Sequence, residues 1–243
     1  MKKLKSLLQR IFNVRFSKEF VCFLISFSLF LALAIFINSK GNEVNVVDAS
    51  IRDFAYQIRG EKNGPFYYVA RSITELGFVY AIIPIFFVFL MFTRLDLRSL
   101  ILGFGSLFSY FCNSLSKLII NRERPILENR WMNESSSSFP SGHSMTAMFF
   151  YGMLIYFVFK SCRTTKKQKT IVISITSLLI LLIGLSRIII GVHYFTDVLG
   201  GFLFGLALVS VFIIIYNLLN DDGYTFLQKR LYKENIWSYW SYF

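Results

Sequence analysis

Cysteine and histidine are scarce in this chain, and the scarcity excludes several kinds of site. Only three cysteines (Cys22, Cys112 and Cys162) and two histidines (His143 and His193) occur among 243 residues. No CxxC pair and no Cys/His spacing typical of a metal site is present. The cysteines show no disulfide framework either, so we expect packing residues or inert thiols. The sequence thus predicts no metal site and no disulfide scaffold.

Two further absences limit the class of protein. The sequence has no internal repeat and no linker that would separate a second domain. It also has no basic stripe on a soluble domain, so the net charge of +12 does not predict nucleic-acid binding. Apolar residues, by contrast, are abundant: 55% of the chain is hydrophobic, 18% is aromatic and the mean hydropathy is +0.54. Such a composition with long apolar runs indicates a multi-pass membrane protein.

Six apolar runs each approach the roughly 20 residues that cross about 30 Å of hydrocarbon. Their ranges are 20–38, 77–93, 99–120, 144–160, 170–187 and 197–218. They predict an all-α integral membrane protein in which six transmembrane helices form a bundle, within one membrane domain over 20–218. Pro84 lies inside the second run, where we expect it to kink the helix.

The two ends of the chain differ from this membrane domain. The basic segment 1–19 places Leu4, Leu8 and Ile11 on one helical face, which predicts an amphipathic helix at the membrane interface. No small-x-small cleavage site follows the first apolar run, so we expect an uncleaved anchor. The tail 219–243 ends in WSYWSYF, an aromatic cluster that suits the headgroup region.

The loop 39–76, between the first two predicted spans, has a helical pattern of its own. Its apolar residues recur at helical spacing: Val47, Ile51, Phe54, Ala55 and Ile58. We predict an amphipathic helix that lies on the membrane surface and ends at the turn from Gly60 to Gly64.

The distribution of Lys and Arg predicts the orientation of the spans. Sixteen of the 26 Lys and Arg fall on one side of the membrane, in 1–19, 94–98, 160–169 and the C-terminal tail. Nine fall on the other side, in 39–76, 121–143 and 187–197. Because cytoplasmic loops carry the excess of positive charge, both termini are predicted to be cytoplasmic and the second set of loops to face outward.

Three polar stretches share the outer side in this topology. Their candidate site residues are Lys117 and Arg124 in KLIINRERP, Ser141, Gly142 and His143 in FPSGHS, and Arg187, His193 and Asp197 in SRIIIGVHYFTDV. Ionisable groups at membrane depth are costly and usually face a partner or a functional site. Three cations that face one cavity would repel one another without an anion, and Arg and Lys donors suit phosphate oxygens. The pattern therefore predicts a phosphate site, whereas Arg122 and Glu123 are expected to be exposed charges.

The third stretch contains a possible nucleophile. His193 and Asp197 are four residues apart, so they share one face at the start of the sixth helix. A carboxylate there holds one imidazole N–H and leaves the other nitrogen free as a nucleophile or base. Gly191 is expected to supply the turn that leads from the fifth helix into the sixth.

The second stretch contains a possible acid. Pro140 and Ser141 stand where the fourth helix begins, and the free N–H groups of a helix start suit an anion. His143 lies in that first turn and points toward the same place, so it is a candidate general acid for a leaving oxygen.

Together these stretches resemble a known signature. K-x6-R-P from Lys117 to Pro125, P-S-G-H up to His143 and S-R-x5-H-x3-D from Ser186 to Asp197 resemble the three-part signature of the type 2 phosphatidic acid phosphatase family. Vanadium haloperoxidases and bacterial acid phosphatases share that signature. The resemblance extends over residues 47–218 and implies an acid phosphatase/vanadium haloperoxidase-like core inside the six-helix bundle.

The resemblance also implies a role for each residue. His193 is similar to the nucleophile that forms a phosphohistidine, Asp197 to its orienting partner and His143 to the acid that protonates the leaving group. The implied phosphate cradle consists of Lys117, Arg124, Ser141, Gly142 and Arg187. The family uses no metal and no other cofactor.

The activity implied by the resemblance is hydrolysis of a lipid phosphate or diphosphate at the outer face of the cell membrane. Undecaprenyl diphosphate, phosphatidylglycerophosphate and phosphatidic acid all fit, and the sequence indicates no particular protein partner. If an alcohol replaces water, the same site is a lipid phosphotransferase. A hypothesis of another class is a six-span transporter that uses the cations only to bind anionic lipids.

Overall fold

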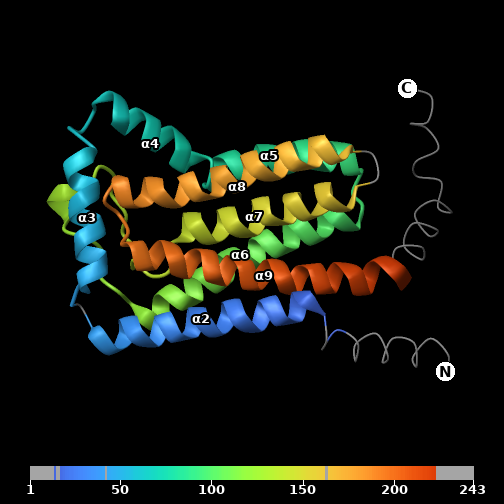
Figure 1. Cartoon of the computed structure of the whole chain (residues 1–243), viewed down its shortest axis with the longest axis horizontal. Coiled ribbons are helices and arrows are strands. Elements are labelled where there is room, and N and C mark those ends of the chain that lie inside the picture. Colours follow the sequence, from blue (N-terminus) through green and yellow to red (C-terminus); the bar gives the residue numbers. More distant parts are fainter. Residues whose placement is uncertain (1–13, 15–16, 42, 162–163, 223–243) are drawn as a thin grey trace.

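The computed structural model describes residues 14, 17–41, 43–161 and 164–222, which form a bundle of α-helices (Figure 1). The elements in chain order are α2 (Lys18–Lys40), α3 (Val46–Ile58), α4 (Pro65–Glu75), α5 (Val79–Thr93), α6 (Leu97–Ile120), the 3-10 turn η1 (Leu127–Asn129), α7 (Gly142–Lys160), α8 (Lys166–Ile189) and α9 (Phe195–Asp222). No strand occurs among these described residues. Most of the predicted amphipathic segment (residues 1–13 and 15–16), the aromatic end of the tail and Cys162 lie outside them.

All six predicted spans are helices in the structure. By length and composition alone, four of the described helices, α2, α7, α8 and α9, are apolar enough to cross a membrane, and the bent pair α4 and α5 makes a fifth. The helix of the remaining predicted span, α6, has 24 residues, but its five serines make it less apolar. It packs against α5, α7 and α9 and runs along the bundle beside them (Figure 1).

The centre of the bundle is the contact of α7 with its neighbours. Buried side chains of α7, such as Phe149 and Met153, pack against Ile183 of α8 and Phe212 of α9. The first turn of α7 approaches α9 closely at Gly201, where a Cβ atom would stand 2.6 Å from the Ser141 carbonyl oxygen. This close approach brings the start of α7 beside the start of α9.

Helix α3 lies across one end of the bundle, where it packs against α8 and α9 (Figure 1). The prediction of a helix here is confirmed, and it ends before the positive-φ residue Gly60. Its predicted apolar face is divided: Ile51 and Ala55 pack on the bundle, whereas Phe54 is exposed. The fully buried side chain of α3 that periodicity did not single out is Asp48.

A bend that the sequence did not predict lies at the start of the second predicted span. Helix α5 continues through Pro84, and the 48° bend separates α4 from α5. The backbone of Leu76, Gly77 and Phe78 makes bonds to the third residue before each, which tightens and ends α4. The chain therefore bends at Gly77, and the kink expected at Pro84 stays a prediction.

Candidate active site

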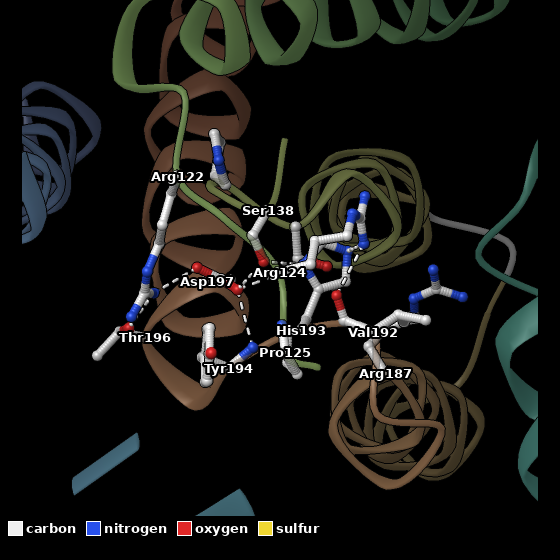
Figure 2. Close-up of polar contacts among 12 residues, drawn as sticks. Arg122, Arg124, Pro125, Ser138, Arg187, Val192, His193, Tyr194, Thr196 and Asp197 are labelled. Carbon is white, nitrogen blue, oxygen red and sulfur yellow. Dashed lines mark hydrogen bonds and ion pairs between the residues drawn. The ribbon is translucent and has the colours of Figure 1, made fainter. Parts of the chain in front are cut away.

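The three polar stretches meet at the end of the bundle that α3 covers. There α6 ends, α7 begins and a short turn joins α8 to α9 (Figure 1). Figure 2 shows Arg124 of the first stretch in one cluster with Arg187, His193 and Asp197 of the third. The predicted convergence of these side chains is therefore seen in the structure.

The turn that carries His193 packs closely against the loop that contains Asn129 and Trp131. Gly191 has a φ of +84°, as predicted for a turn glycine, and a Cβ atom on it would stand 2.8 Å from the Asn129 carbonyl oxygen. The backbone N–H of Trp131 also donates to the Ile190 carbonyl at 2.9 Å. His193 is thereby presented from a rigid turn and is only 2% exposed.

The imidazole ring of His193 lies between a carboxylate and a cation (Figure 2). Its Nδ1 is 3.5 Å from Asp197 Oδ2 and 3.4 Å from Ser138 Oγ. Its Nε2 is 3.2 Å from Arg124 Nη1. Ser138, which sequence reasoning did not single out, is fully buried and donates its hydroxyl to Asp197 Oδ2 at 2.5 Å. The two ring nitrogens therefore face different surroundings.

Asp197 belongs to a buried ionic network. Its Oδ1 accepts a bond from Arg122 Nη1 at 2.6 Å, and its Oδ2 accepts the backbone N–H of Tyr194 at 2.8 Å. The other arm of Arg122 donates to Asp48 at 2.7 Å. The expectation that Arg122 is an exposed charge is wrong: the residue is 6% exposed, because two buried carboxylates compensate its desolvation. Glu123 is exposed, as expected.

Two predicted cradle cations contact the loop before α7. Lys117 Nζ, from the last turn of α6, donates to Ser136 Oγ at 3.1 Å and to the Ser137 carbonyl at 2.5 Å. Arg124 donates to the Ser136 carbonyl at 2.6 Å and to the Val192 carbonyl at 2.8 Å. These backbone contacts hold both cations beside His193.

Arg187 is the most deeply placed cation of the site. It is fully buried, and its two terminal nitrogens donate to Thr74 Oγ1 at 3.0 Å and to Glu134 Oε1 at 2.5 Å. Its Nε has no hydrogen-bond partner in the described part of the chain. Glu134 also lies 3.9 Å from Arg124. No pattern in the sequence marked Glu134, an acidic residue in a polar loop.

The second predicted histidine, His143, lies in the first turn of α7. The Phe78 ring stacks on it, with centroids 5.1 Å apart and an angle of 15° between the planes. His143 is within electrostatic reach of His193 and of all three cradle cations. The ring is therefore oriented by Phe78 at the edge of the cluster.

Ser141 and Gly142 mark the start of α7. Ser141 is the N-cap and is fully buried; its Oγ accepts a bond from Ser144 Oγ at 2.9 Å, which leaves its own proton available to an acceptor. Its N–H donates to the Asp197 carbonyl at 2.9 Å, which ties α7 to α9. The N–H of Gly142 is among the first in the helix, which have no partner inside it.

Burial and nearby positive charges determine the protonation state of His193. Burial, followed by the nearby charges of Arg124, Arg187 and Lys117, holds the pKa of His193 well below its usual value of 6.5. Its imidazole is therefore neutral and nucleophilic near neutral pH. Burial lowers the pKa of Arg124 to about 10, so that this side chain keeps its charge.

A polar cavity of about 370 Å³ opens next to the cluster, lined by residues 121–124 and 134–137 together with Arg130. It gives water and small polar groups a route to the cations. Among the described residues, no group of three or more His, Cys, Asp or Glu side chains is arranged to hold a metal ion.

Comparisons with known proteins agree with this architecture. The PAP2 superfamily pattern matches residues 98–221, which include every motif residue above. Phosphatidylglycerophosphatase B of Bacillus subtilis (strain 168) is 36% identical over 187 residues, 75% of this chain and 88% of the relative.

Two solved structures are similar as well. The crystal structure of a transmembrane PAP2-type phosphatidylglycerolphosphate phosphatase from Bacillus subtilis matches with a TM-score of 0.70 and 33% identity, over 80% of this chain and 96% of that one. Aquifex aeolicus LpxE shares the fold, with a TM-score of 0.55 and 22% identity over 71% of this chain and 97% of that one. The chain therefore belongs to the PAP2 superfamily and is a multi-pass membrane phosphatase of lipid phosphates.

Proposed function

We propose that this protein hydrolyses a lipid phosphate or diphosphate without a metal, through a phosphohistidine on His193. The observation that carries the proposal is the buried guanidinium of Arg187, whose Nε is unpaired in the described part of the chain, in a cluster where His193 Nε2 faces Arg124. An unpaired donor in a cationic cluster suits a phosphate oxygen. Phosphatidylglycerophosphate, the substrate in the names of the Bacillus subtilis relative and of the similar Bacillus subtilis structure, is the first to test; phosphatidic acid and undecaprenyl diphosphate follow.

The chemistry proceeds in two steps. In the first, His193 Nε2 attacks phosphorus, a P–N bond forms, and the P–O bond to the leaving group breaks as His143 gives that oxygen a proton. The Nδ1 proton remains on the ring and faces Asp197 and Ser138, which orient the imidazole and stabilise its positive charge. In the second, His143 takes a proton from water, whose oxygen attacks phosphorus and releases His193 and inorganic phosphate.

The cations stabilise the phosphoryl group while it is transferred. Arg187 and Arg124 offer planar forks and Lys117 a point charge, and these fixed charges need no reorganisation as negative charge develops on the phosphoryl oxygens. The Ser141 hydroxyl and the Gly142 N–H add neutral donors at the start of α7. Side chains thus supply the positive charge that a metal supplies in other phosphatases.

The direct test is phosphate release from phosphatidylglycerophosphate by the purified protein in detergent with excess EDTA. We expect turnover at an unchanged rate, and an acid-labile, base-stable phosphoryl group on the protein after rapid quenching. Loss of activity in EDTA that divalent metal restores would overturn the metal-free mechanism. Turnover without any trapped phosphohistidine would overturn the covalent step. Added glycerol as acceptor distinguishes hydrolysis from phosphotransfer, since only a phosphotransferase yields glycerol phosphate.

We also place both termini in the cytoplasm and the site on the outer face. The end of α7, at Lys160, and the first turn of α8, with Lys166, Lys167 and Lys169, lie at the opposite end of the bundle from α3 (Figure 1). This excess of positive charge is typical of the cytoplasmic side. In a cysteine-free background, cysteine at exposed Ser135 should react with an impermeant thiol reagent on whole cells, whereas cysteine at Lys167 should react only after lysis. The reverse pattern would invert the topology.

A further inference from the structure

We infer that Asp48 of α3 is a positioning residue for the phosphoryl transfer, acting on His193 through Arg122 and Asp197. It lies 149 residues before Asp197 in the chain and outside all three motifs. The inference rests on the proposed function, because it assumes that His193 is the nucleophile.

The carboxylate of Asp48 is fully buried and saturated with donors. Its Oδ1 accepts the backbone N–H of Thr196 at 2.9 Å. Its Oδ2 accepts from Thr196 Oγ1 at 2.6 Å, Arg122 Nη2 at 2.7 Å and Asn45 Nδ2 at 2.6 Å. A buried carboxylate with this many partners has one orientation, so it acts as a fixed anchor.

Arg122 connects this anchor to the orienting carboxylate. Its Nη1 donates to Asp197 at 2.6 Å and to Thr196 Oγ1 at 2.8 Å (Figure 2). Its Nη2 donates to Asp48. The guanidinium also lies 4.5 Å from the centre of the Tyr194 ring. Because the fork is planar and rigid, its contact with Asp48 fixes the position from which it meets Asp197.

The same anchor holds the first turn of α9. Thr196 stands between His193 and Asp197 in the chain, and Asp48 binds both its N–H and its hydroxyl. A carboxylate at a helix N-terminus is favourable, because it satisfies free N–H groups and complements the helix dipole. Here the cap comes from another helix, so α3 determines where α9 begins.

A second contact of α3 restrains the other side of the turn. Arg59 donates to the Ile189 carbonyl at 3.2 Å and lies 3.9 Å from the centre of the Tyr56 ring. A Cβ atom on Gly191 would stand 3.0 Å from both the Tyr56 hydroxyl and an Arg59 nitrogen. Helix α3 therefore contacts the His193 turn before and after the histidine, and Asp48 is the contact that is linked to His193 through Arg122 and Asp197.

The test compares two aspartates on one helix. Asp48→Asn keeps the shape and removes the charge, whereas Asp53→Asn makes the same change at a residue paired with Arg52 near the surface. For the full-length protein in detergent with phosphatidylglycerophosphate and EDTA, we expect Asp48→Asn to lower kcat about 10- to 100-fold with KM within about 2-fold, because a small misplacement of the nucleophile has effects of this size. Asp53→Asn should match the wild type.

A double-mutant cycle separates positioning from general stability. If Asp48 acts through Asp197, Asp48→Asn should lower kcat by less than about 2-fold in an Asp197→Asn background. Equal losses of kcat in both backgrounds would overturn the inference, as would a kcat for Asp48→Asn within about 2-fold of the wild type. If Asp48→Asn does not fold, Thr196→Val takes its place in the cycle. Thr196→Ser, which keeps the hydroxyl, should restore kcat, and failure to restore it would count against the network.

Failure of this inference is distinguishable from failure of the proposed function. If only the inference fails, His193→Ala is inactive and phosphohistidine is trapped in the wild type, yet Asp48→Asn turns over normally. If the proposed function fails, His193→Ala retains activity and no phosphohistidine is trapped, whatever Asp48→Asn does.

Discussion

The two sides of His193 differ in how their charges are compensated. On the Nδ1 side, Asp48 and Asp197 share one guanidinium, and their oxygens are bonded to fixed donors. On the Nε2 side, three cradle cations (Lys117, Arg124 and Arg187) face one carboxylate, Glu134. The formal charge is thus −2 + 1 = −1 on the first side and +3 − 1 = +2 on the second.

This difference separates two tasks within a few ångströms. On the Nδ1 side the carboxylate oxygens already accept hydrogen bonds, so this side binds no further ligand and instead positions the ring. The cationic side carries a surplus that matches the charge of a phosphate dianion, and one of its donors, Arg187 Nε, is unpaired in the described part of the chain. Buried polar groups normally find partners, so a donor left over at a cationic site is best explained by a ligand.

The largest effect is expected where the two sides meet. His193→Ala removes the nucleophile, so kcat should fall by roughly 10⁴-fold or more, as for other covalent catalysts that lose their attacking group. Phosphate release from phosphatidylglycerophosphate measures the loss, and thermal unfolding in detergent checks that the fold persists. A folded variant with substantial activity would remove the assignment of His193.

Asp197→Asn disrupts the hydrogen-bond network on the Nδ1 side of His193. We expect kcat to fall by roughly 10²- to 10⁴-fold while KM changes little, because the orienting carboxylate is lost but the cradle remains. Asp53→Asn, the same change near the surface, is the matched control. A large rise in KM with an unchanged kcat would show instead that Asp197 serves binding.

Arg187→Lys tests whether the cationic side uses the planar guanidinium or only its charge. The charge is kept but the planar fork is lost, so kcat/KM should fall by about 10- to 100-fold. The exposed Arg71, whose Nη1 contacts the Tyr67 hydroxyl, allows the same substitution away from the cluster and should give wild-type rates. Equal rates for Arg187→Lys and the wild type would show that only the charge is used.

The smallest effect is a shift of the pH profile. The pKa of His193 is held well below 6.5 by burial and by Arg124, Arg187 and Lys117, so the acid limb of kcat/KM should lie well below pH 6.5. Arg124→Gln removes one of these cations, so the pKa of His193 should rise and the acid limb should move to higher pH. Arg71→Gln should leave the limb in place; a limb that moves equally in both variants would exclude the local effect.

The pH dependence of conformational stability should also depend on the protonation of His193. Because the folded pKa of His193 is depressed, the unfolded chain binds more protons below pH 6.5. The contribution of His193 to stability is therefore complete above pH 6.5 and is lost as the pH falls below that value. Thermal unfolding of the wild type and of His193→Ala across this range measures the difference.

Much of the fold was predictable because hydropathy is a local property. The six predicted spans are all helices, and the α3 helix was predicted from the spacing of Ile51, Phe54 and Ala55. The bend at Gly77 was not predicted, because the tightened end of α4 depends on how that helix packs and no residue type marks it.

The cluster of motif residues was predictable for a related reason. Once alternate loops are assigned to opposite sides of a membrane, Arg124, His143 and His193 must share a side. Their partners were not predictable. Ser138 is one of four consecutive serines before FPSGHS, Glu134 is an acidic residue in a polar loop, and Arg122 resembled an ordinary exposed charge. Whether a charge is buried depends on its partners, and those of Arg122 lie 74 and 75 residues away.

The sequence by itself determined that this protein is a helical membrane bundle and which residues carry the PAP2 signature, because apolar runs and short motifs are written in consecutive residues. Only the tertiary structure decided which charges are paired and which are available. It placed Asp48 and Arg122 behind Asp197, and it left Arg187 Nε without a partner in the described part of the chain, since pairing depends on distances between side chains that are far apart along the chain.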